Sequence, residues 1–158
     1  MSLSVSKSLE NKILETLRGL KPGVQCVGFL EVSADGVQKE QDLSAIQVRV
    51  YNFAQVTEAS GMFTVAVEIR LNVEQAESAN GSAFVVAHEA VALWLERVML
   101  DDACAELDTN EAYVDGLQRT GGDKDFDTSD GVWYAVWNMT LSGRIKPKPE
   151  QQEATDNG

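Results

Sequence analysis

Apolar residues recur at helical spacing near the start of the chain. Leu9, Ile13 and Leu17 follow one another at intervals of four residues, which predicts an amphipathic helix that stops at the Lys-Pro-Gly segment 21–23. Either Ser4 or Ser6 is expected to cap its first turn. Charged residues alternate with the apolar positions of this helix: Lys7, Glu10, Lys12, Glu15 and Arg18.

A second helix is predicted over residues 82–100, where the hydrophobic period becomes helical. One stripe of this helix is apolar and consists of Phe84, Ala87, Val91, Trp94 or Leu95, and Val98. The polar segment before it, residues 74–81, ends in Asn80-Gly81. This pair predicts a break immediately before the helix.

Alternation with a period of two predicts strands elsewhere. The clearest segment is 63–73, in which six apolar side chains occupy every second position from Phe63 to Val73. Further strands are predicted over residues 46–53, 112–119 and 132–145, and over residues 24–32, where nearly every position is apolar and both faces are expected to be covered. The polar and acidic residues 120–130 are expected to form a connection between the last two strands.

This order of elements predicts the fold class. Because the strands follow one another instead of alternating with helices, we expect an α+β domain with a mostly antiparallel sheet of about five strands. The two amphipathic helices are expected on one face, in the order α-βββ-α-ββ. Residues 1–145 would form this single domain, and residues 146–158, almost without apolar side chains, a disordered tail. The other sheet face would carry Arg49, Tyr51, Thr64, Glu68, Arg70, Tyr134, Val136 and Thr140, and such a face often meets a partner.

Composition narrows the functional classes. The 158 residues contain 13 Lys and Arg against 25 Asp and Glu, for a net charge of −12. Such an acidic chain is a poor candidate for binding nucleic acid or an anionic membrane, because phosphate contact relies on clustered cations. The most apolar region, residues 83–100, carries charges that disfavour a membrane span. Cys26 and Cys104 are far apart, and two free thiols are favoured over a disulfide.

Four carboxylates gather before the last strand: Asp123, Asp125, Asp127 and Asp130. An EF-hand loop starting at the first of them would need glycine and glutamate where Thr128 and Tyr134 stand, so that pattern fails. Three interpretations stay open, namely a solvated hairpin tip, another kind of metal site, and an interaction loop for a basic surface. We commit to no metal, cofactor or catalytic residue and keep the four aspartates as candidate interaction residues.

The remaining chemistry does not indicate an enzyme. His88 is the single histidine, and no serine or cysteine nucleophile motif accompanies it, so a structural role is favoured over general-base catalysis. Gly121-Gly122 matches no phosphate-binding loop. Trp94, Trp133 and Trp137 are expected in the core, with a stacking platform for a ligand as the alternative.

The layout resembles the tail-terminator, or tail-completion, proteins of long-tailed bacteriophages and prophages. The similarity spans residues 5–145 and rests on the opening helix, the strands 24–32, 46–53 and 62–73, and the helix 82–100. It also includes the segment 125–134, Asp-Phe-Asp-Thr-Ser-Asp-Gly-Val-Trp-Tyr, which leads into an aromatic closing strand.

The resemblance implies a virion structural protein that forms a hexameric ring, caps the tail tube and joins it to the head. Its partners would be further copies of itself, the tail tube protein and a head-completion or neck protein, with no cofactor, no sequence-specific nucleic acid and no membrane. It would be located in the phage tail or neck after assembly in the bacterial cytoplasm. Edge strands and the acidic loop would be natural contact surfaces. The alternatives are a monomeric acidic protein-binding module or charge mimic, and a small enzyme.

Overall fold

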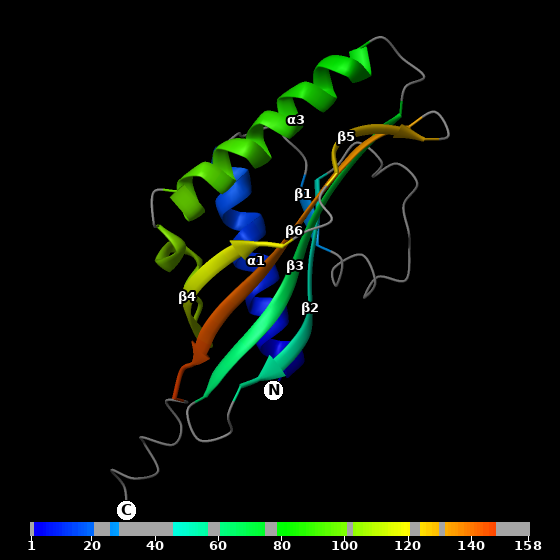
Figure 1. Cartoon of the computed structure of the whole chain (residues 1–158). Coiled ribbons are helices and arrows are strands. Elements are labelled where there is room, and N and C mark those ends of the chain that lie inside the picture. Colours follow the sequence, from blue (N-terminus) through cyan, green and yellow to red (C-terminus); the bar gives the residue numbers. More distant parts are fainter. Residues whose placement is uncertain are drawn as a thin grey trace, which may run out of the picture.

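The computed structural model in Figure 1 describes residues 2–20, 26–28, 46–56, 61–74, 79–100, 103–120, 124–129 and 132–147. The helices are α1 (Ser2–Leu20) and α3 (Ala79–Leu95). The strands are β1 (Cys26–Gly28), β2 (Ile46–Gln55), β3 (Met62–Glu74), β4 (Ala112–Arg119), β5 (Lys124–Ser129) and β6 (Val132–Ile145). The predicted strand 24–32 contains β1, and its other residues lie outside the described part. The predicted strand 46–53 lies wholly within β2.

The strands pair into one sheet in the order β1-β2-β3-β6-β4, with β5 also paired to β6. β1 lies parallel to β2, and the other described pairs are antiparallel. The α+β class is therefore confirmed, whereas the predicted strand number and order are not. The reason is β5, which lies within the segment 120–130 that we expected to be only a connection.

β4 and β5 pair in succession with the same edge of β6. The pairing passes from Arg119 opposite Met139 to Lys124 opposite Val136, and the Thr120 amide donates a hydrogen bond of 2.9 Å to the Asn138 carbonyl between them. The two short strands thus act as one interrupted outer strand. A polar strand at an edge carries little alternation, which is why the pattern of residues 120–130 did not reveal it.

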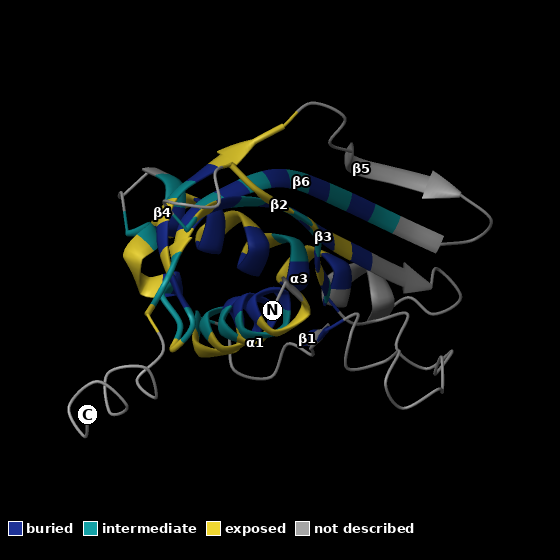
Figure 2. Cartoon of the chain, turned by 90° about the horizontal axis from the view of Figure 1, so that it is seen from below, coloured by how far each residue is buried: buried dark blue, intermediate teal, exposed yellow. Residues whose placement is uncertain are grey.

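Both helices cover the same face of the sheet, and the buried residues gather between the two layers (Figures 1 and 2). The inward-facing positions of the three central strands are at most 4% exposed: Ile46, Val48, Val50, Phe63, Val65, Val67, Ile69, Leu71, Ala135, Trp137, Met139 and Leu141. These positions pack against the predicted apolar stripe of α3 and the turn that follows it. All residues of this stripe are buried: Phe84, Ala87, Val91, Trp94, Leu95 and Val98. The expected inward faces of these elements are confirmed.

The first helix begins earlier than predicted, at Ser2, so neither Ser4 nor Ser6 is its cap. Val5 is 2% exposed and precedes Leu9 by four residues, which extends the buried stripe by one turn. Ser4 instead donates a side-chain hydrogen bond to the carboxylate of Glu111, close to the start of β4. Tertiary packing, not a local cap, therefore determines where this helix starts.

Glu10 is a second exception in α1, because its side chain is fully buried and not on the outer side of the helix. It lies against β1, where a Cβ atom added to Gly28 would stand 2.5 Å from Glu10 Oε2. The missing side chain at Gly28 therefore makes room for the carboxylate between helix and strand.

The second helix also begins before its predicted break, so Asn80-Gly81 is helical. A glycine inside a helix costs only about 1 kcal/mol, which the buried apolar stripe of α3 offsets. Beyond Leu95 the chain continues as a π-helical turn over Glu96–Leu100 and then a short 3-10 helix over Cys104–Leu107. These turns lead the chain into β4.

The first residue of the predicted tail, Lys146, contacts the start of β4 and the residue before it. The Lys146 amide donates a 2.8 Å hydrogen bond to the Glu111 carbonyl, and its ammonium group lies 4.5 Å from the ring centroid of Tyr113. Lys146 therefore belongs to the folded part. The rest of the predicted tail, residues 148–158, lies outside the described residues.

Candidate interaction surfaces

Two of the four candidate aspartates belong to β5, which forms a hairpin with β6. Asp125 and Asp127 are residues of β5, and Asp127 stands in register with Tyr134 of β6. Asp123 and Asp130 lie outside the described residues, as do the side chains of the other two. Where side chains are described, no three His, Cys, Asp or Glu residues form a group that could hold a metal ion.

Two of the three tryptophans that we expected in the core lie there. Trp94 and Trp137 are 0% and 2% exposed, and Trp94 Nε1 donates a 2.8 Å hydrogen bond to Thr16 Oγ1 of the first helix. The side chain of Trp133 lies outside the described part. The imidazole of His88 packs with its centroid 5.1 Å from Trp137, which is a packing role in the helix–sheet interface.

The two cysteines are both free thiols, in agreement with the sequence-based preference. Cys26 is buried on β1, and this burial raises the pKa of its thiol, against a smaller lowering by the charge of Arg18. Cys104 is only half-buried.

We therefore expect the two thiols to react with Ellman's reagent at different rates at pH 8. The half-exposed Cys104 should react at least about tenfold faster than Cys26, because the thiolate is the nucleophile and burial both hides Cys26 and suppresses its ionisation. A Cys104→Ser variant should lose the fast phase and release the second thiol only in denaturant. Equal rates for the two thiols in the native protein would contradict the burial of β1.

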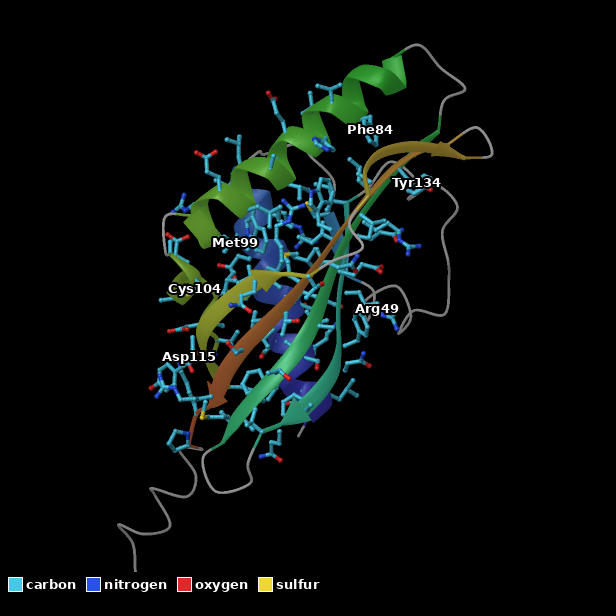
Figure 3. All side chains as sticks on the ribbon, viewed as in Figure 1. Arg49, Phe84, Met99, Cys104, Asp115 and Tyr134 are labelled. Carbon is cyan, nitrogen blue, oxygen red and sulfur yellow. The ribbon has the colours of Figure 1, made fainter. Side chains whose placement is uncertain are left out.

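Two exposed surfaces stand out in the described part. The first is the sheet face that points away from both helices, here called the open face. Its described exposed or half-buried residues come from the predicted alternation: Gln47, Arg49, Tyr51, Thr64, Ala66, Glu68, Arg70, Tyr134, Val136, Asn138, Thr140 and Ser142. Figure 3 shows Arg49 and Tyr134 on this side of the sheet.

Two arginines and one glutamate carry the charge of this part of the open face. The Arg49 guanidinium lies 4.2 Å above the ring centroid of Tyr51, and the Arg70 Nη2 is 3.4 Å from Glu68 Oε1. Arg49 stands opposite Glu68 in the sheet, so Arg70 is its diagonal neighbour on the same face. Small side chains lie beside them in the next row, where Ala66 pairs with Thr140. This part of the open face therefore has short side chains beside two arginines and one glutamate, with a net positive charge.

The second surface is the outer side of α3, which the sequence analysis did not identify. Val85, Val86 and Leu93 are 60%, 41% and 44% exposed, and Glu89 and Glu96 lie exposed between and beyond them. The available signal was that α3 is apolar on two sides, whereas a helix that covers a sheet needs only one apolar stripe. The five residues are called the α3 outer stripe below.

The charges of the α3 outer stripe are acidic. Arg97, the basic residue that follows the stripe, makes a bidentate ion pair with Glu106. Its Nη2 and Nε donate hydrogen bonds of 2.7 Å and 3.0 Å to the two carboxylate oxygens. This hydrogen bonding lowers the pKa of Glu106 below its ordinary value. The positive charge of Arg97 is thus already matched within its own protomer, and along the stripe the carboxylates alternate with apolar side chains.

Some backbone groups of the outer strands are already hydrogen-bonded within the protomer. Arg18 Nη2 donates a 2.7 Å hydrogen bond to the Cys26 carbonyl of β1. On β4, the Val114 amide donates a 2.7 Å hydrogen bond to Asp108 Oδ1. Side chains of the same protomer therefore occupy backbone groups that a strand of a partner would need.

The charge is unevenly distributed along the chain. Acidic and basic residues are equal in number among those whose side chains the structure describes, so the net charge of −12 resides in the rest of the sequence.

Among the described helices, none is both long and apolar enough to cross a membrane. No protein-family model matches this chain, and no curated protein is significantly similar to it.

Proposed function

We propose that this chain is a structural protein of a bacteriophage or prophage that assembles into a ring of identical copies at the end of the tail tube. The observation that carries the proposal is the placement of two exposed surfaces on opposite sides of one helix–sheet layer, the α3 outer stripe and the open face. Contacts between two different surfaces of identical copies run head to tail, and they close into a ring when the rotation per copy divides a full turn.

The ring would cap the tube, stop its growth and present a surface to the head, as the similarity of layout to tail-terminator proteins implies. Six copies, the tail tube protein and a head-completion or neck protein are the partners in this proposal, and the virion tail or neck is the location. A charge mimic is less favoured, because such a protein needs dense ordered carboxylates, whereas acids and bases balance in the described part.

The proposal predicts self-association of the full chain, alone or on a tube. Mass photometry and multi-angle light scattering should show a monomer of 17.2 kDa in exchange with a ring, near 103 kDa for six copies. Where the free protein stays monomeric, addition of polymerised tube protein from the same phage or prophage should recruit it. Electron micrographs should then show a ring at one end of each tube, with tube growth stopped.

The control is the same measurement with an unrelated phage's tube protein, which should recruit nothing. A chain that stays monomeric at high concentration and neither binds nor stops its own tube protein would overturn the proposed function.

A further inference from the structure

We infer that the α3 outer stripe of one copy docks onto the open face of the next copy, so that helix and sheet layers alternate around the assembly. The inference rests on the proposed self-association and names the two surfaces that make it. The occupant of each surface is a second copy of this chain, because each surface offers what the other lacks. The α3 outer stripe alternates exposed apolar side chains with two acids, and this part of the open face has short side chains beside two arginines and one glutamate, with a net positive charge.

Charge favours this pairing over the symmetric one. Two α3 outer stripes that met across a twofold axis would bring Glu89 and Glu96 against their own counterparts, and like charges in an interface weaken it. Against the open face the same carboxylates meet Arg49 and Arg70, both exposed, whose two positive charges outnumber the single negative charge of Glu68 beside them. Opposite charges both stabilise and orient such a contact.

The dimensions of the two surfaces also agree. Glu89 of α3 and Glu96, the first residue of the π-helical turn that continues α3, lie on one side of the helix, about 10 Å apart along its axis. The Cα atoms of Arg49 and Arg70, as diagonal neighbours on adjacent strands, are about 7–8 Å apart. The long arginine side chains span the difference, so one helix laid across β2 and β3 can pair both carboxylates at once.

The apolar part of the contact lies between and beside these charges. Along the axis of α3, Val86 lies before Glu89 and Leu93 lies after it. On the open face, the short side chains of Ala66 and Thr140 stand side by side on β3 and β6. Small residues allow a helix to approach a sheet closely, which lets the exposed leucine and valine be buried.

Charge reversal tests the inference. The first variant carries Glu89→Arg and Glu96→Arg, and the second carries Arg49→Glu and Arg70→Glu. Each variant alone sets like charges against each other, so the concentration for half-assembly should rise about tenfold or more. An equimolar mixture should assemble again with the two variants alternating, because the interface is complementary in both directions. Circular dichroism melts of each variant provide the folding control.

The outcomes separate the inference from the proposed function. If the unmodified chain forms rings and both variants do so equally well, the docking inference is wrong and the ring proposal stands. If only the α3 variant loses assembly and the mixture gives dimers, a twofold contact replaces the inferred one. If the unmodified chain never assembles, with or without tube protein, the proposed function itself fails.

Disulfide trapping gives a second readout that does not depend on charge. In a Cys104→Ser background, Leu93→Cys combined with Ala66→Cys should yield a ladder of covalent oligomers on oxidation, because each contact joins two different positions. Either cysteine alone should give no ladder. A ladder that is absent from an assembling double variant would contradict the inferred contact.

Discussion

Replacing Val67 with aspartate is expected to unfold the domain. Val67 is 1% exposed on the central strand β3, on the face that the helices cover. The change removes about 1.5–3 kcal/mol of apolar burial and adds a carboxyl group whose burial costs several kcal/mol more. Because small domains are stable by only about 5–15 kcal/mol, this single change uses most or all of that margin. Circular dichroism and urea titration should show loss of a cooperative transition.

The matched control is Val136→Asp, the same substitution on the neighbouring strand β6. Val136 is half-buried on the open face, opposite Arg70 in the register, so the new carboxylate stays in contact with water and near a cation. This variant should fold and melt close to the unmodified chain. A cooperative Val67→Asp protein of ordinary stability, or equal damage by both changes, would contradict a sheet covered on one face only.

The long strands were predictable because one side of the sheet is buried and the other is not. Alternation from Phe63 to Val73 follows directly from that asymmetry, and the register then brings Arg49, Glu68 and Arg70 to the same face. The inward stripe of α3 was predictable for the same reason, since burial against a flat layer selects one helical stripe. In both cases the packing that matters repeats along the chain itself.

Elements whose stability comes from distant contacts were not predictable in this way. β5 contains Phe126 as its single strongly apolar residue and exists as a strand through pairing with β6. The first turn of α1 forms because Val5 reaches the core and Ser4 reaches Glu111, more than a hundred residues away. Local patterns carry no information on either contact.

The α3 outer stripe marks a different limit of sequence analysis. Val85, Val86 and Leu93 are as apolar as the residues of the inward stripe, so composition alone cannot say which stripe is buried. The exposed fractions decide it, because they leave an apolar surface with no cover within the described part of the protomer. The residues that carry the docking inference were therefore visible in the sequence, whereas their exposure was not.

Replacing Gly143 with alanine is expected to destabilise the protein by about 3 kcal/mol, at the upper end of the usual range for overpacking. Gly143 lies in β6 between Phe63 of β3 and Val114 of β4, on the buried face. An added Cβ would stand 2.3 Å from the Tyr113 carbonyl oxygen and 2.9 Å from Phe63 Cζ. The Phe63 ring also stacks on Phe53, with centroids 5.3 Å apart, so neither neighbour can yield cheaply.

Gly116→Ala is the matched control for this change, because Gly116 pairs with Ser142 in the same β4–β6 ladder. Its added Cβ would meet Ser142 Oγ at 3.4 Å, an ordinary contact, and alanine also loses less backbone freedom on folding than glycine. This variant should match or slightly exceed the unmodified chain in stability, as measured by urea titration.

The Tyr113 carbonyl beside Gly143 is part of the backbone of β4, so removing the clash requires β4 to move away from β6. Hydrogen exchange in Gly143→Ala should therefore accelerate at β4 amides first, and equal stability of the two alanine variants would show that the strands are not packed this closely.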